Sequence, residues 1–530
     1  MAQQFHNNAE LEKALEDVIA SSKMIEGLNR PTPGCYALDM IGDSMVARQN
    51  QIYALDNTYT GDVTNGVLTL TSPSTTWSMH AGNKFYLMNV TPDSAVTLYT
   101  CIAGTTSLTV KATCDLPIPD CVLDFSTITN TSGPFMVRIW RSADTSVATH
   151  AAAYSNGAIE KGYCMGFNSR PSYYLPAKIH DFLDWIPNKN RRILVHWMGI
   201  NDIGIFGSNG SGTFANIKIN LDILKTLGYA KIIVNTIGPV DTTTYSGWNT
   251  TMRNNINYCN MLIKQYVSQN PEFILNDNCS YNMSTATTCT AVANTLEDQV
   301  HLSALGAERA GKGLWDNILS KLGLPVVKKT PSTAMEAFTN ISAQIFNGIY
   351  NMDATTGALA SGGSLAGGAT GTVKSSFTLT NLSSTAVAGT MPARSGIEGG
   401  YDQQIDWTSS AAGQGWSWGF TTPVTSRITA DKRLRCFLEV TFSGCTNVKS
   451  LHPNLTVTYG GLSTGLCCTV PTTTTKAMEN GDRTVLYEFG HIGYITPGTC
   501  DFTFLVTLVM GAAGGGTIKL SAPVCYLESV

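Results

Sequence analysis

The stretch "RRILVHWMGINDIG", residues 191–204, holds the clearest strand signal of the chain. Its apolar run is nearly continuous, which is typical of a central strand in a parallel sheet, where both faces are covered. The run ends at Gly199 and is followed by Asn201 and Asp202. The Asn201 amide could then point over the carboxyl edge of the sheet, where ligands bind in open α/β folds. An Asx-turn that only closes the strand is the alternative for this residue.

The segments on either side repeat a rhythm of strands and helices. Residues 35–41 are predicted to form a buried strand, and "SVATHAAAYSNG" (146–157) is interpreted as a strand and turn. Further strands are predicted at 231–238 and 272–277, and helices at 212–228, 251–267 and 303–319. Alternating βαβ units predict a parallel sheet with helices on both faces.

Two other regions have the period-two alternation of β-strands. The first interrupts the α/β pattern and either shapes a substrate cleft or serves as an interface module. The second follows a linker and predicts a β-sandwich or jelly roll. The predicted domains are therefore an N-terminal helix and linker (1–34), an α/β domain (35–50 plus 141–325), a β-rich insertion (51–140), a linker (326–339) and a β-sandwich (340–530).

Residues 8–28 are predicted to form one helix, capped by Asn8 and carrying a single apolar stripe. A short helix cannot bury such a stripe alone. It either docks on the body of the protein or packs against copies of itself in an oligomer.

The composition of the chain argues against nucleic-acid binding and against a membrane span. The chain of 530 residues has a net charge of −4, and only 14% of its residues are charged. No basic stripe favours nucleic-acid binding, and no segment reaches the roughly 20 apolar residues of a membrane span. Residues 1–18 lack the apolar stretch of a secretion signal. The fourteen cysteines lack zinc-site spacing, so they are interpreted as buried free thiols, with local disulfides Cys114–Cys121 or Cys279–Cys289 as the alternative.

Four short motifs could carry chemistry. Ser44 lies in "GDS" directly after the 35–41 strand, and Gly157 ends the 146–157 segment. Asp298 and His301 form a D-x-x-H pair before the last helix of the α/β region. A serine nucleophile needs a base, a group that orients the base, and donors for the oxyanion. Each motif alone also has an ordinary explanation as a turn or a capped loop.

The order GDS, N-G, G-x-N-D and D-x-x-H resembles the SGNH (GDSL) hydrolase superfamily, over residues 35–50 and 145–320. The resemblance implies a flavodoxin-like three-layer α/β/α fold that needs neither metal nor cofactor. It assigns Ser44 as nucleophile, His301 as base and Asp298 as the group that orients the base. The oxyanion hole would consist of the Ser44 backbone N–H, the Gly157 N–H and the Asn201 side chain.

The remaining regions bear on the substrate. Residues 340–530 loosely resemble carbohydrate-binding jelly rolls, and Trp407, Trp416 and Trp418 either stack on sugar rings or belong to a core. The whole arrangement looks like a phage tail spike. That resemblance implies an O-acetyl esterase for bacterial capsule or O-antigen polysaccharide, extracellular after lysis. It also implies a homotrimer attached to a virion through its N-terminus. The alternatives are a non-catalytic glycan-binding adhesin and a lipid or thioester hydrolase.

Overall fold

The computed structural model of the 530-residue chain describes a large part of the sequence. The predicted N-terminal helix (8–28) and the linker (326–339, apart from its first residue) lie outside the described residues. The described residues are 35–47, 57–64, 67–72, 84–89, 96–101, 109–113, 132–140, 146–166, 170–241 without 178, 185 and 187, 247–277, 284–285, 289–326, 363–394, 401–428, 432–459, 462–467, 478–492 and 498–529 without 522.

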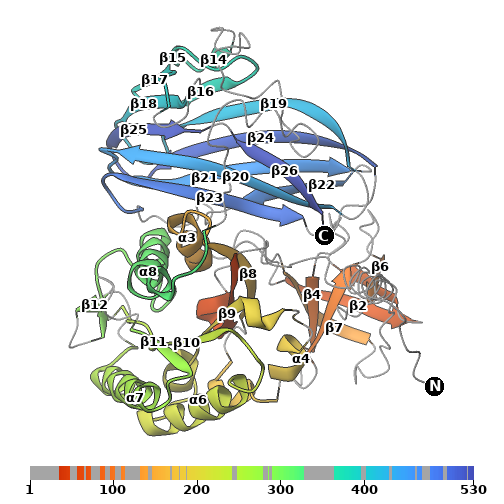
Figure 1. The fold of residues 1–530 in the computed structure, drawn as a ribbon, viewed down its shortest axis with the longest axis vertical. Coiled ribbons are helices and arrows are strands. Elements are labelled where there is room, and N and C mark those ends of the chain that lie inside the picture. Colours follow the sequence, from red (N-terminus) through yellow and green to blue (C-terminus); the bar gives the residue numbers. More distant parts are fainter. Residues whose placement is uncertain are drawn as a thin grey trace, which may run out of the picture.

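A five-stranded parallel sheet forms the centre of the α/β domain (Figure 1). Its spatial order is β11-β10-β9-β1-β8, which is the flavodoxin-like order 2-1-3-4-5 read from the other edge. The chain order reverses between β1 and β9, so a ligand site is expected where these two strands end. The strands are β1 (Tyr36–Gly42), β8 (Ile159–Gly166), β9 (Arg192–Trp197), β10 (Lys231–Asn235) and β11 (Phe273–Asn276).

Helices cover both faces of this sheet, as predicted (Figure 1). α3 and α8 contact each other on one side, and α6 and α7 contact each other on the opposite side. None of the described helices is long and apolar enough to cross a membrane. The helices of the domain are α2 (Ser44–Ala47), α3 (Ser146–Tyr154), α4 (Ile179–Leu183), α5 (Ile200–Gly204), α6 (Gly210–Leu224), α7 (Thr250–Gln269) and α8 (Ala304–Asn317).

Helix α3 corrects one sequence interpretation, because residues 146–154 were expected to form a strand. The buried residues Val147, Ala148, Ala151 and Ala152 recur at helical spacing and pack into the core of the α/β domain. Gly311 of α8 lies so close that a Cβ on it would meet the backbone of α3. Small residues on both helices therefore allow a close crossing, and the strand β8 follows only after the turn at 155–158.

The insertion between β1 and α3 is a closed six-stranded antiparallel barrel of order β2-β3-β6-β5-β4-β7. Closure leaves none of these strands with an unpaired edge. The barrel therefore completes its own hydrogen bonding and contacts the α/β domain through α4. Its strands are β2 (Asn57–Thr64), β3 (Val67–Ser72), β4 (Lys84–Asn89), β5 (Val96–Cys101), β6 (Thr109–Thr113) and β7 (Ser132–Trp140).

The C-terminal region contains two larger sheets whose inner faces share one hydrophobic cluster. Trp416 and Trp418 come from the first sheet, and Ile405 and Leu438 come from the second. The first sheet has β14 (Ser364–Ala366), β16 (Thr378–Leu382), β19 (Gly415–Ile428), β24 (Gly498–Met510), β21 (Val448–Tyr459) and β22 (Leu462–Cys467). The second has β15 (Thr370–Gly371), β17 (Ala386–Thr390), β18 (Gln403–Ser409), β25 (Gly514–Leu520), β20 (Lys432–Ser443), β23 (Arg483–Ile492) and β26 (Val524–Ser529).

One described cysteine agrees with the expected buried free thiols, and another does not. Cys289 is a buried free thiol that donates to the Gly238 carbonyl, which excludes the Cys279–Cys289 disulfide. Cys436, in contrast, is disulfide-bonded and not a free thiol. Cys114 and Cys121 lie outside the described residues.

Candidate active site

Ser44 lies where the central strand β1 ends and the short helix α2 begins. Its neighbour Asp43 is fully buried and ties this turn to the end of β9. One carboxylate oxygen of Asp43 accepts from the Met45 N–H at 2.9 Å, and the other accepts from the Gly199 N–H at 3.2 Å. Burial raises the pKa of Asp43 to about 7, although these two N–H donors oppose the shift. The Asp therefore links the serine turn to the loop that follows β9.

A tightly closed loop carries Asp298 and His301. The Glu297 N–H donates to the His301 carbonyl at 2.8 Å, and the Ser303 N–H donates to the Thr295 carbonyl at 3.0 Å. Inside the loop, the Asp298 carboxylate accepts from the backbone N–H of His301 at 2.9 Å. The first of these backbone hydrogen bonds is nested inside the second. The five residues 297–301 are therefore closed into a tight loop, which leaves the backbone of His301 little freedom.

Ser44, His301 and Asp298 form a continuous hydrogen-bonded line. His301 Nε2 is 2.9 Å from Ser44 Oγ, and His301 Nδ1 is 2.7 Å from an Asp298 oxygen. Burial acts to raise the pKa of Asp298, but the His301 imidazole and two backbone N–H groups outweigh it and hold that pKa below its ordinary value. The ionised Asp298 accepts from Nδ1–H and leaves Nε2 as the acceptor for the serine proton. The three residues predicted for this role are therefore in contact.

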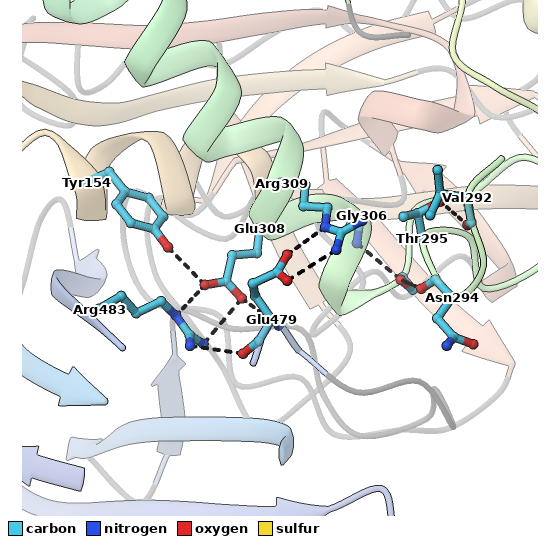
Figure 2. A network of polar contacts seen from close by, with 10 residues as sticks. Tyr154, Val292, Asn294, Thr295, Gly306, Glu308, Arg309, Glu479 and Arg483 are labelled. Carbon is cyan, nitrogen blue, oxygen red and sulfur yellow. Dashed lines mark hydrogen bonds and ion pairs between the residues drawn. The ribbon is translucent and has the colours of Figure 1, made fainter. Parts of the chain in front are cut away.

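The helix that follows the loop is anchored at its first turn. Ser303 caps α8 by accepting from the Gly306 N–H at 3.2 Å, and its hydroxyl donates to the Asn294 carbonyl at 2.5 Å. Gly306 permits close packing, because a Cβ there would meet the Thr295 carbonyl. Figure 2 shows Gly306, Asn294 and Thr295 together at this end of α8. The position of the loop that carries His301 is thus fixed relative to the start of α8.

Asn201 lies in the first turn of α5, directly after β9, and is buried. Its amide nitrogen donates to the Arg170 carbonyl at 3.1 Å, which holds the 170–174 segment against α5. An amide nitrogen has two N–H donors, so this bond engages one of them. The hydrogen bond between the Gly199 N–H and Asp43 brings the loop that bears Asn201 to the serine turn.

Gly157 is in the wrong place for an oxyanion donor. It precedes β8, and its carbonyl accepts from the Cys35 thiol before the start of β1. Gly157 therefore lies at the amino end of the sheet, whereas Ser44 follows the carboxyl end. The error results from interpreting α3 as a strand. The glycine at the carboxyl end of β8 is Gly166, which pairs with Gly42. With 146–154 assigned as a helix, the next strand would have indicated Gly166.

The three tryptophans considered for sugar binding are core residues. Trp416 and Trp418 are fully buried, and Trp418 stacks on Phe377 with ring centroids 4.5 Å apart. Trp407 is 4% exposed and directs its Nε1 toward Met510 Sδ at 3.3 Å. None of these rings presents a face to solvent, so of the two alternatives for these tryptophans the core assignment is confirmed and glycan stacking is excluded.

The C-terminal sheets contact the α/β domain through α3 and α8. Figure 2 shows Glu308 of α8 meeting Tyr154 of α3 and Arg483 of β23. The Glu308 carboxylate lies 2.5 Å from Arg483 Nε and accepts from Tyr154 Oη at 3.0 Å, and both charged side chains are buried. Beside them, Arg309 pairs with Glu479 in a two-pronged contact, with Nε to Oε2 at 2.5 Å. The helix that follows His301 is therefore connected to the C-terminal sheets by two ion pairs.

Comparisons with known proteins give no strong match. No family model matches the chain, and no curated protein matches it. A structure described as "Peptidoglycan O-acetylesterase in action, 5 min" is 13% identical, covers 60% of this chain and 98% of its own, and has a TM-score of 0.31. A carbohydrate esterase family 3 structure from Talaromyces cellulolyticus is 19% identical, covers 30% of this chain and 72% of its own, and has a TM-score of 0.24. A GDSL-like lipase from Bacteroides thetaiotaomicron is 18% identical, covers 33% of this chain and 83% of its own, and has a TM-score of 0.27. Similarity at this level does not establish a family.

Proposed function

We propose that the chain is a serine esterase of the SGNH type. The observation that carries the proposal is the line from Ser44 Oγ through the His301 imidazole to the Asp298 carboxylate, with contacts of 2.9 and 2.7 Å. A carboxylate, an imidazole and a hydroxyl in this order are the parts of a nucleophilic triad. They lie at the carboxyl edge of a 2-1-3-4-5 sheet, next to its switch point.

The reaction follows from this geometry. Ser44 Oγ attacks the acyl carbonyl carbon while His301 Nε2 takes the hydroxyl proton. The Ser44–acyl bond forms as the ester C–O bond breaks, and His301 returns the proton to the departing alcohol. Water then attacks the acyl-enzyme by the same route and releases the carboxylic acid.

The oxyanion donors in this proposal are the Ser44 backbone N–H, the Asn201 amide and the backbone at Gly166. Gly166 replaces Gly157 because β8 ends beside β1 at Gly42, and α2 contacts β8. Two backbone donors and one side-chain amide are a typical set for a tetrahedral oxyanion.

We further propose that the substrate is an O-acetylated bacterial surface polysaccharide and that the protein acts on the outside of a virion. The order of the four motifs and the weakly charged, β-rich remainder of the chain support this proposal. A homotrimer attached through the N-terminus belongs to the same proposal. The burial of Trp407, Trp416 and Trp418 means that the glycan must be bound by other residues.

The test compares Ser44→Ala with the wild-type protein on 4-nitrophenyl acetate and on a panel of acetylated bacterial polysaccharides. We expect acetate release from wild type and at least a 10³-fold loss in the variant, with unchanged circular dichroism. Equal turnover by both proteins would exclude the triad. A wild type without activity that still binds glycan would point to an adhesin, and a preference for long acyl chains would point to a lipid or thioester hydrolase.

A further inference from the structure

Three exposed apolar side chains lie beside the candidate oxyanion loop. Ile205 and Phe206 follow α5 and are 59% and 45% exposed, and Tyr173 is 55% exposed. The Tyr173 and Phe206 rings meet edge to face, with centroids 5.9 Å apart and an angle of 77°. We call these three side chains the aromatic ledge. Neighbouring exposed apolar side chains of this kind commonly mark a binding site.

The aromatic ledge is connected to the candidate active site through the backbone of α5. The backbone N–H groups of Ile205 and Phe206 both donate to the Asn201 carbonyl, at 2.9 and 3.1 Å. The two side chains therefore lie one helical turn beyond Asn201. Asn201 in turn follows Gly199, which is tied to the serine turn through Asp43.

Buried hydrogen bonds hold together the two segments that carry the aromatic ledge, which are the segment around Ser172 and helix α5. The buried Asp202 carboxylate accepts from the Ser172 N–H at 2.7 Å and from the Ser172 hydroxyl at 2.6 Å. Asn220 donates to the Ser172 carbonyl at 3.1 Å. The neighbours of Ser172 and Asp202 in sequence are thus held in fixed positions. A preorganised binding surface requires buried hydrogen bonds of this kind, which fix the positions of the residues that carry the exposed rings.

We propose that the aromatic ledge binds a sugar ring of the leaving alcohol, directly beside the ester that Ser44 attacks. This inference rests on the proposed esterase function. The rings are about half exposed, and a pyranose needs only one of its C–H faces on an aromatic face while its hydroxyls stay in water. A long acyl chain needs enclosure on most of its surface, which a half-open pair of rings does not supply. The sugar would thus be held before and during transfer of the acyl group to Ser44.

The test uses Phe206→Ala, Tyr173→Ala and the double variant, with glucose pentaacetate, ethyl acetate and 4-nitrophenyl octanoate as substrates. Ile219→Ala is the matched control, because Ile219 is 50% exposed on α6. We expect each ring variant to lower kcat/KM for glucose pentaacetate about three- to tenfold through KM, and to leave ethyl acetate unchanged. The control should behave as wild type on all three esters.

Three results would overturn this proposal while leaving the esterase assignment intact. The first is an equal loss of kcat/KM by the ring variants on glucose pentaacetate and on ethyl acetate. The second is a loss by these variants that is confined to 4-nitrophenyl octanoate. The third is a wild-type protein that does not prefer glucose pentaacetate to ethyl acetate. A wild type that hydrolyses none of the three esters would instead refute the proposed function itself.

Discussion

At the scale of single residues, two carboxyl groups close to Ser44 have opposite electrostatic environments. Asp298 faces an imidazole and two backbone N–H donors, and its pKa lies below the ordinary value. Asp43 is buried near Asp202, and its pKa is raised to about 7. Such a divergence is common in active sites, where different carboxyl groups have different roles. Here Asp298 would orient the base, whereas Asp43 positions the backbone.

Asp298→Asn should lower kcat by about 10³- to 10⁴-fold with little change in KM, because an amide no longer fixes the Nδ1–H tautomer of His301. Steady-state kinetics on 4-nitrophenyl acetate would measure this. The loss should persist at every pH, since the depressed pKa keeps wild-type Asp298 ionised throughout the neutral range. Recovery of the variant at alkaline pH would contradict an orienting role.

Asp43 should make the folded protein less stable as pH rises from about 4 to about 7. In the unfolded chain the Asp43 carboxyl loses its proton near its ordinary pKa of 3.8, whereas in the folded protein it keeps the proton up to about pH 7. The stabilising contribution of Asp43 is therefore fully present below pH 3.8 and is lost as the pH rises through about 7. It amounts to at most about 4 kcal/mol, at about 1.4 kcal/mol for each pKa unit.

Asp43→Asn should remove this pH dependence. Urea unfolding at pH 4.5 and pH 8 would compare the free energy of unfolding of the two proteins. We expect the wild type to lose more stability across this interval than the variant, which is less stable at low pH because an amide offers one acceptor oxygen to two N–H donors. Parallel pH profiles would show that Asp43 is ionised at both pH values.

Some of these site residues could be predicted from the sequence, and others could not. Asp298 and His301 are three positions apart, so one short loop is enough to bring them together. The burial of Trp416 and Trp418 depends on β24 and on Phe377, which are distant in sequence. A cluster of aromatic letters cannot show whether a second sheet covers it.

At the scale of elements, Trp248 connects the helix that bears Asn201 to the loop that bears the base. Its indole packs on Gly204 of α5, and its Nε1 donates to Gln299 Oε1 at 2.9 Å. Gln299 directly follows Asp298, and its backbone carbonyl accepts from the Asp241 N–H at 2.8 Å. The indole therefore sets the spacing between the two halves of the candidate site.

Gly204→Ala should disturb this spacing. A Cβ at Gly204 would lie 2.6 Å from Trp248 Cζ2, so the indole or α5 must move. We expect kcat to fall by about tenfold or more, because small displacements of reacting groups are costly. Gly247→Ala is the control, since a Cβ there meets nothing within 4 Å. A variant at Gly204 with wild-type kcat would show that the site tolerates the shift.

The wrong prediction for α3 shows that a short apolar run does not determine the type of secondary structure. Residues 146–154 are short and apolar, and such runs do not distinguish a buried strand from a buried helix. The longer helices α6 and α7 were predicted because their amphipathic repeats extend over several turns. One wrong element was enough to misplace Gly157 by the whole length of β8.

At the scale of the whole molecule, the ion pair between Glu308 and Arg483 joins two regions of the chain. Arg483→Met should leave the Glu308 carboxylate buried without its counter-charge and lower the free energy of unfolding by about 3–5 kcal/mol. The double variant with Glu308→Gln should recover part of this loss, because Gln still accepts from Tyr154. Urea denaturation measures both effects. Lys225→Met, at the exposed pair with Asp222, serves as the control and should not change stability.

An equal stability of Arg483→Met and the Lys225 control would show that the contact between the two regions contributes nothing. The sequence could not have predicted this contact, because Glu308 and Arg483 are 175 positions apart and lie in different predicted domains. Charge patterns within one element reveal pairs at helical spacing, but not pairs across an interface.

The contact between Ser44 and His301 spans 257 positions of the chain. A ribosome makes the nucleophile early, then the entire barrel, and only much later the base. Arg483, which anchors α8, emerges later still. The emerging polypeptide therefore cannot assemble the triad until most of it has left the ribosome, and long-range contacts of this kind form slowly. Any hydrolytic activity would thus appear only after the segment that carries Asp298 and His301 has been made and has folded against β1.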